Sequence, residues 1–185
     1  MAALLLAMLV RFRRDRGGVS AVEFALIAPL LMLIYFGLGE LCEAMMAQRR
    51  TVHAASAIGD LATQNSALAA SDVSDIFAAA GTIMSPFSTA PLKMRLTSIT
   101  ANASGVAKVD WSCGYGGLTA NTAGSTYAGL PTGLVSAAGD SVIVAEGRYT
   151  WTSPAAYVLP NGLNFNESFY LKPRKSSTIA GPASC

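Results

Sequence analysis

Val19-Ser-Ala-Val-Glu-Phe-Ala-Leu-Ile-Ala-Pro-Leu-Leu-Met-Leu-Ile-Tyr-Phe-Gly-Leu-Gly39 is the stretch of the chain that decides the fold. Its residues are apolar or small except for Ser20, Glu23 and one tyrosine. At about 1.5 Å per helical residue, the stretch covers the roughly 30 Å hydrocarbon core of a bilayer. We therefore predict a transmembrane helix over residues 19–39.

The charges beside this segment predict its direction in the membrane. Four arginines precede it against a single aspartate, whereas the first charges after it are Glu40 and Glu43. Cytoplasmic flanks carry the excess of basic residues, so residues 1–18 are expected to be a cytoplasmic leader and everything after the span to be periplasmic. The leader holds four of the 13 basic and one of the 11 acidic side chains. Since the remaining chain is close to neutral, nucleic acid is not an expected partner.

Glu23 is an acid near the mouth of the span. A charged carboxylate in hydrocarbon costs about 2.5–3.5 kcal/mol or more, so a partner is expected for it. One alternative is that Glu23 extends to the interface and has no special role. The other is that a peptidase cuts after Gly18, which would leave the new α-amino group of Val19 about one helical turn away. That amine, on this chain or on a neighbouring subunit, would be the cation.

The residues around this junction resemble a known processing motif. Basic residues, Gly18, a cut before Val19, Glu23 as the fifth residue of the mature chain, Phe24 and an unbroken apolar helix are similar to the type IV prepilin motif. The resemblance implies cleavage by a membrane-embedded aspartyl prepilin peptidase on the cytoplasmic face. Gly18 and Glu23 would carry the recognition.

A longer string narrows the resemblance. Ala21-Val-Glu-Phe-Ala-Leu-Ile-Ala-Pro-Leu-Leu31, with Glu40 closing the span, resembles the TadE-like minor pseudopilins of the tight-adherence (Tad/Flp) pilus system. The match covers about Arg16 to Arg50. It implies a single-pass protein of the bacterial inner membrane, with a place in the pilus as a further alternative. Its implied partners are the prepilin peptidase, other pilin and pseudopilin subunits and the inner-membrane pilus assembly platform.

Pro29 interrupts the span. It removes one backbone hydrogen bond and clashes with the carbonyl four residues earlier, so a kink or local unwinding is expected near Ala25. Two explanations remain open. Proline is commoner in membrane helices than in soluble ones, and a flexible point would help a pilin helix to leave the bilayer or to pack.

The helical pattern continues beyond the span. Polar and apolar residues recur at helical spacing on different faces, which predicts one helix from about Val19 to Gln64, with residues 40–64 as its periplasmic extension. The expected apolar face, which would lie on a soluble domain, is Leu41, Met45, Val52, Ala55 and Ala62. The expected polar stripe is Arg49, His53, Ser56, Asp60 and Gln64.

Residues 65–185 read as a small periplasmic α+β domain. A capped helix is predicted from Ser71 to about Ile83, and the remainder alternates with the period of strands. The predicted strands of this antiparallel sheet of about four strands are Leu92–Thr100, Gly105–Cys113, Ser141–Thr152 and Glu167–Lys175. Residues 102–105 read as a hairpin loop, and the Gly/Thr-rich Gly114–Gly139 segment as either a functional loop or a poorly ordered one. A long helix before a small sheet is the order of pilin-like subunits.

The three cysteines differ in position. Cys42 lies at the outer end of the span and is expected to be a small packing residue. Cys113 and Cys185 would both lie in an oxidising periplasm, so a disulfide between them is expected to tie the C-terminal tail to the sheet.

The sequence gives little support for an enzyme. It has no nucleophile elbow, phosphate loop, metal-binding cluster or haem motif, so no catalytic residue, metal or cofactor is predicted. The single histidine, His53, is expected to be a solvated surface residue. The sequence thus predicts a processed minor pseudopilin that acts in pilus biogenesis through helix packing with pilin subunits. The alternatives are an uncleaved, membrane-anchored periplasmic binding or adhesin module, and an anchored enzyme with a non-standard site.

Overall fold

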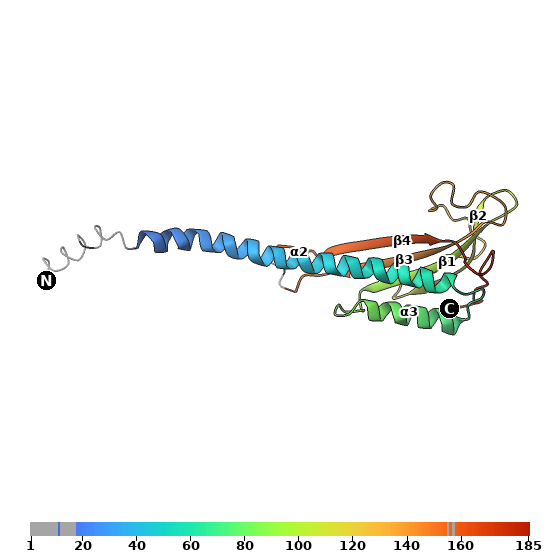
Figure 1. Ribbon diagram of the computed structural model, residues 1–185, viewed down its shortest axis with the longest axis horizontal. Helices are drawn as coiled ribbons and strands as arrows, with labels where there is room; N and C mark the ends of the chain where they lie inside the picture. Colours follow the sequence, from blue (N-terminus) through green and yellow to red (C-terminus); the bar gives the residue numbers. More distant parts are fainter. Residues whose placement is uncertain (1–10, 12–17, 155, 157) are drawn as a thin grey trace.

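A computed structural model describes residues 11, 18–154, 156 and 158–185 of the chain (Figure 1). The leader predicted over residues 1–18 therefore lies outside the described residues except for Arg11 and Gly18. In chain order, the described part contains α2 (Val19–Thr63), α3 (Ala70–Ile83), β1 (Leu92–Ala101), β2 (Ala107–Tyr115), β3 (Ser141–Trp151) and β4 (Leu163–Leu171). The predicted α+β class, with a long N-terminal helix and an antiparallel sheet, is confirmed.

Helix α2 is continuous over 45 residues. Its N-terminal half projects away from the rest of the molecule, and its C-terminal half lies along the sheet and α3 (Figure 1). The helix passes through Ala25 and Pro29 without interruption, so the expected local unwinding does not occur. A kink at Pro29 remains a prediction.

The four strands form one sheet in the order β2-β1-β3-β4, with antiparallel neighbours. The first three predicted strands are present, with ends shifted by up to two residues. The fourth was placed wrongly over Glu167–Lys175, because β4 begins four residues earlier and ends at Leu171. Pro173 has no backbone N–H to donate to a neighbouring strand. The pairing of Tyr149 with Phe165 fixes the register instead.

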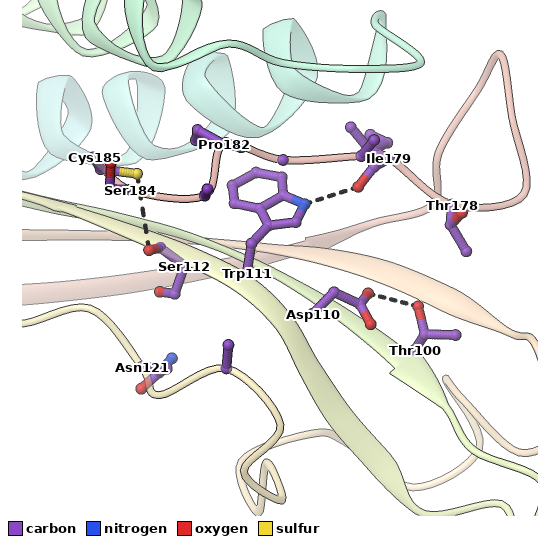
Figure 2. Close-up of a pocket in the computed structure, with 14 residues that line it drawn as sticks. Thr100, Asp110, Trp111, Ser112, Asn121, Thr178, Ile179, Pro182, Ser184 and Cys185 are labelled. Carbon is purple, nitrogen blue, oxygen red and sulfur yellow. Dashed lines mark hydrogen bonds between the residues drawn. The ribbon is translucent and has the colours of Figure 1, made fainter.

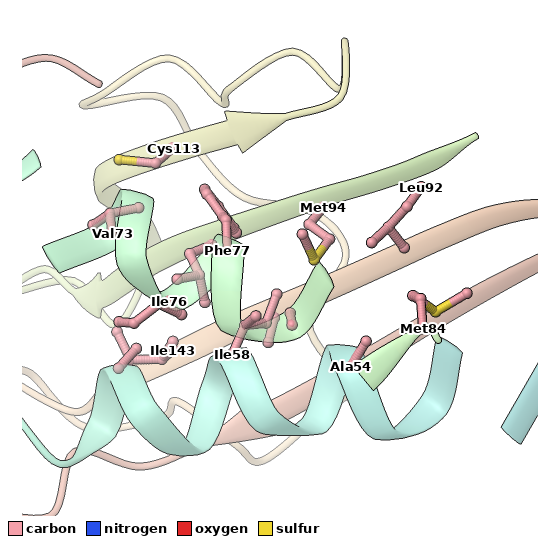
Figure 3. Packing of buried hydrophobic residues seen from close by; sticks show 14 of the residues in the cluster. Ala54, Ile58, Val73, Ile76, Phe77, Met84, Leu92, Met94, Cys113 and Ile143 are labelled. Carbon is pink, nitrogen blue, oxygen red and sulfur yellow. The ribbon is translucent and has the colours of Figure 1, made fainter. Parts of the chain in front are cut away.

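Helices α2 and α3 cover one face of the sheet and enclose the main core. The labelled side chains from both helices and from the strands point toward one another between these layers (Figure 3). The largest of the fully buried ones are aliphatic side chains and methionines, which fill the space without leaving a polar atom unpaired. They include Ile58, Val73, Met84, Leu92, Met94, Leu96 and Ile143.

The segment between β2 and β3 covers the other face of the sheet. Its Tyr127, Leu130 and Val135 pack on a second buried cluster made by Ile99, Val142 and Val144. The hydroxyl of Tyr170 on β4 also donates to the backbone oxygen of Gly129, at 3.1 Å. This segment is thus folded onto the sheet, and the alternative of a poorly ordered loop is wrong.

Small residues let α2 approach β3 closely. A Cβ at Gly147 would lie 2.8 Å from the Cβ of Ala55, and one at Gly59 would lie 3.0 Å from the Cβ of Ala145. The buried face of α2 is therefore a stripe of small side chains, which contains Ala55 and Ala62 of the predicted apolar face but not Leu41 and Met45. Those two side chains are 46% and 48% exposed. The buried stripe contains Ala44, Ala47, Thr51, Ala54, Ala55, Ile58, Gly59 and Ala62.

The C-terminal tail closes the end of the domain farthest from the projecting half of α2. Its backbone exchanges hydrogen bonds with the α2–α3 connection, at 2.8 Å from Leu68 to Ala180 and 3.2 Å from Ala180 to Ser66. Cys185 is joined to Cys113 at the end of β2 by a disulfide with a Cα–Cα distance of 5.6 Å, within the range that such bonds span. Cys42 is exposed on α2 rather than packed.

Removing this disulfide is expected to lower the free energy of unfolding by about 2–4 kcal/mol, because the bond restricts the unfolded chain across 72 residues. The test is urea unfolding of the double variant Cys113→Ser/Cys185→Ser in detergent. Cys42→Ser is the matched control, since its thiol is exposed and unbonded. Equal unfolding midpoints for the double variant and the control would contradict the prediction.

Candidate membrane and assembly surface

Among the described residues, the uncovered half of α2 carries the largest set of exposed apolar side chains. It has a mean hydropathy of 2.1 over its most apolar window, and none of that window is buried. The large apolar side chains from Val19 to Leu38 are 47–75% exposed, whereas a soluble protein buries most such residues. The large side chains of this set include Phe24, Leu26, Ile27, Leu30, Leu31, Leu33, Tyr35, Phe36 and Leu38. Length and composition make this half a candidate membrane span.

The residues of the predicted cleavage site lie at the free end of this surface. Gly18 precedes the first helical residue and accepts a hydrogen bond from the backbone N–H of Val22, at 3.1 Å. Among the described residues, no atom beyond its chain neighbours lies within 4 Å of where a Cβ would stand on Gly18. Phe24 is 68% exposed. Gly18, Val19 and Glu23 are also exposed in the described part of the chain.

Glu23 is exposed on the second turn of α2. Within the described residues no hydrogen bond or ion pair to its carboxylate is seen, and in the uncut chain the nitrogen of Val19 is an amide rather than an amine. The structure thus places Glu23 one turn from the predicted new N-terminus, and the described residues supply no cation to it. A charged carboxylate that lies in hydrocarbon calls for a partner.

Glu40 joins the span to the domain. Its side chain is 95% removed from solvent, with a relative exposure of 5%. Its Oε2 accepts hydrogen bonds from the backbone N–H groups of Val158 and Leu159, at 3.1 and 3.0 Å. Val158 also contacts α2 at Gly37, where a Cβ would lie 3.1 Å from its Cγ2. From the sequence, Glu40 was identified only as the end of the predicted span. Its contact with the β3–β4 connection was not predicted.

The outer face of the sheet carries a separate charged group. Arg95 on β1 binds Glu146 on β3 through two hydrogen bonds of 2.5 and 2.8 Å, and donates a third to the backbone oxygen of Thr119 at 2.9 Å. Burial, followed by the nearby Glu146 carboxylate, raises the pKa of Tyr127 above its ordinary value. This group ties the β2–β3 segment to the sheet.

A cleft of about 730 Å³ lies between β2 and the C-terminal tail (Figure 2). Trp111 fills one side of it and donates through Nε1 to the backbone oxygen of Ile179, at 2.8 Å. Asp110 accepts hydrogen bonds from Thr100 and Ser98, at 2.6 and 3.0 Å. These contacts hold the strands and the tail together, and they bring no histidine or second side-chain carboxylate to the cleft. In the described part of the chain no group of three or more His, Cys, Asp or Glu side chains is placed to hold a metal ion.

The comparison with protein families agrees with these features of α2. Residues 18–59 match a family model described as TadE-like protein. The match begins at Gly18, ends at Gly59 in the small-residue stripe, and covers less than a quarter of the 185 residues. The resemblance drawn from the residues is confirmed over this stretch. Neither a curated protein nor a solved structure matches the chain.

Proposed function

We propose that this chain is a minor pseudopilin of the Tad/Flp pilus system, cut between Gly18 and Val19 by a prepilin peptidase. The observation that carries the proposal is the coincidence of the TadE-like match over residues 18–59 with a helix whose most apolar window has no buried residue in the described chain. Such a helix has two uses. It can lie in the bilayer, and it can pack against the helices of other subunits.

The processing step would supply the missing partner of Glu23. Hydrolysis of the Gly18–Val19 peptide bond adds water and releases an α-carboxylate on the leader and an α-amino group on Val19. That amine is protonated at neutral pH. Paired with Glu23 of this chain or of a neighbour, it removes a lone charge from hydrocarbon. The pairing would favour helix packing at one register along the helix axis.

The charge pattern supports an orientation for this helix. The arginines before the span favour a cytoplasmic N-terminus in the bacterial inner membrane, with α3 and the sheet in the periplasm. A disulfide between Cys113 and Cys185 suits that compartment. The partners we propose are the peptidase, pilin and pseudopilin subunits, and the inner-membrane assembly platform; the role is structural and needs no cofactor.

The deciding experiment is intact-mass measurement with N-terminal sequencing of the protein from membranes, in cells with and without their prepilin peptidase. We expect a chain that begins at Val19 only when the peptidase is present. Replacing Gly18 by tryptophan is expected to leave the full-length precursor, and Gly39→Trp, at another open glycine of α2, is the control that is still cut. A chain that keeps residues 1–18 in every case would instead identify an uncleaved anchored module.

A further inference from the structure

A groove of about 690 Å³ lies between α2 and the chain that follows α3. It is on the side of the domain that faces the projecting half of α2, because α3 runs back along α2 and its last residue, Ile83, accepts a hydrogen bond from Arg50 Nη1 at 3.1 Å. The wall formed by α2 carries two arginines, and the wall formed by Ile83 and Phe87 is apolar. The lining residues that matter here are Met46, Arg49, Arg50, His53, Ile83 and Phe87.

The positive charge in this groove is not compensated. Within the described residues, neither Arg49 nor Arg50 forms an ion pair. Asp60 also lines the groove, but its carboxylate already binds Arg174 and accepts a hydrogen bond from Gln64 Nε2 at 2.8 Å. Two guanidinium groups therefore remain for an anion from outside the chain. Arginine is well suited to phosphate, which it binds through paired N–H groups.

The same face of α2 leads from this groove into the span. Residues three and four positions apart share a helix face, and the exposed side chains on this one change along the axis from apolar residues to an arginine and a histidine. They are Leu38, Cys42, Met45, Arg49 and His53. An acyl chain lying along the apolar residues would thus end at the arginines. This arrangement fits an amphiphile with an anionic head.

The level of the arginines also agrees with a lipid headgroup. With the span over residues 19–39, Arg49 lies ten residues beyond its end, about 15 Å along the helix axis at 1.5 Å per residue. Helical side chains lean toward the N-terminus, which here is toward the membrane. An extended arginine side chain covers about half of that distance, and the headgroup layer is roughly 5–8 Å thick. Arg49 can therefore reach the outer edge of the headgroup layer.

We propose that this groove binds the anionic headgroup of a phospholipid in the periplasmic leaflet. Arg49 and Arg50 contact the phosphate, Ile83 and Phe87 cover the glycerol region, and an acyl chain follows α2 past Met45. The inference rests on the membrane anchorage in the proposed function and is independent of cleavage. Its role is to hold the base of the domain against the bilayer at a set rotation.

The test uses the full-length protein in lipid nanodiscs and measures the association of spin-labelled phosphatidylglycerol relative to spin-labelled phosphatidylcholine. We expect a preference of about fivefold or more for phosphatidylglycerol, since one basic side chain near an anionic surface contributes roughly that factor. Arg49→Gln/Arg50→Gln should bring the preference close to one. Arg49→Lys/Arg50→Lys, which keeps the charge, should retain most of it.

Two controls keep the result specific. Lys172→Gln/Lys175→Gln removes the same charge from exposed lysines near the tail, at the other end of α2, and should leave the preference unchanged. Arg49→Gln alone spares the Arg50–Ile83 hydrogen bond and should still halve the preference or more. The proposal would be overturned if Arg49→Gln and Arg49→Gln/Arg50→Gln both kept the wild-type preference for phosphatidylglycerol. It would also be overturned if Lys172→Gln/Lys175→Gln lost as much of that preference as the double arginine-to-glutamine variant. Failure of the protein to enter nanodiscs at all would overturn the anchorage itself.

Discussion

Glu23→Ala inserts and folds normally but fails to assemble with pilin subunits: this is the result expected if Glu23 pairs with a subunit N-terminus. The substitution removes a charge from an exposed position on the second turn of α2, far from the core, so the stability of the domain is unaffected. An unpaired α-ammonium group is then left in hydrocarbon. Breaking a buried ion pair in this way costs about 3–5 kcal/mol, which corresponds to more than a hundredfold loss of assembled protein.

The measurement is the amount of the variant that co-purifies with pilin subunits after crosslinking in membranes. Glu43→Ala is the matched control, because it removes another exposed acid of α2 outside the proposed pairing. Glu23→Asp keeps the charge on a shorter side chain and should recover part of the assembly. Normal co-purification and piliation with Glu23→Ala would exclude the pairing.

Gly147→Val is expected to destabilise the domain by about 3 kcal/mol. The added Cβ would lie 2.8 Å from the Cβ and 3.6 Å from the Cα of Ala55, so helix α2 itself would have to move off the sheet. Overpacking of this kind costs about 1–3 kcal/mol and more where backbone resists. Against a total stability of 5–15 kcal/mol for a typical domain, the loss is large.

Thermal unfolding in detergent, followed by circular dichroism, measures this effect. The control is Gly81→Ala in α3, where the new Cβ would meet only Thr89 Cγ2 at an ordinary 3.8 Å. That variant should melt at or above the wild-type temperature, because alanine favours helix over glycine. If Gly147→Val unfolded at the same temperature as the Gly81→Ala control, the close packing of α2 on β3 would not determine the stability of the domain.

Local patterns were sufficient to predict most of the secondary structure. Helix α2 was predicted within one residue at its end because its sequence combines an unbroken apolar run with an amphipathic continuation. The first three strands alternate clearly. Strand β4 was placed four residues too late although Leu163, Phe165, Phe169 and Leu171 also alternate. Asn164 and Asn166, which stand between the first of these residues, are disfavoured in strands and weaken the pattern.

Features that depend on distant residues could not be predicted. Glu40 is stabilised by backbone groups 118 and 119 positions away, and the same side chain in isolation looks like an ordinary acid at the end of a span. The buried face of α2 was misjudged for a related reason. Hydrophobicity favours Leu41 and Met45, whereas the close approach of β3 selects for small side chains. The groove with Arg49 and Arg50 depends on where α3 ends and was also missed.

The continuity of α2 gives the molecule a mechanical property. The same 45-residue helix forms the projecting apolar half and one layer of the folded domain, and Glu40 fastens the β3–β4 connection to it where the two parts meet. Between Pro29 and the sheet, α2 is unbroken. A rotation of this part of the helix about its axis is therefore expected to be transmitted to the sheet. A force along that axis is likewise expected to move the folded domain together with the helix.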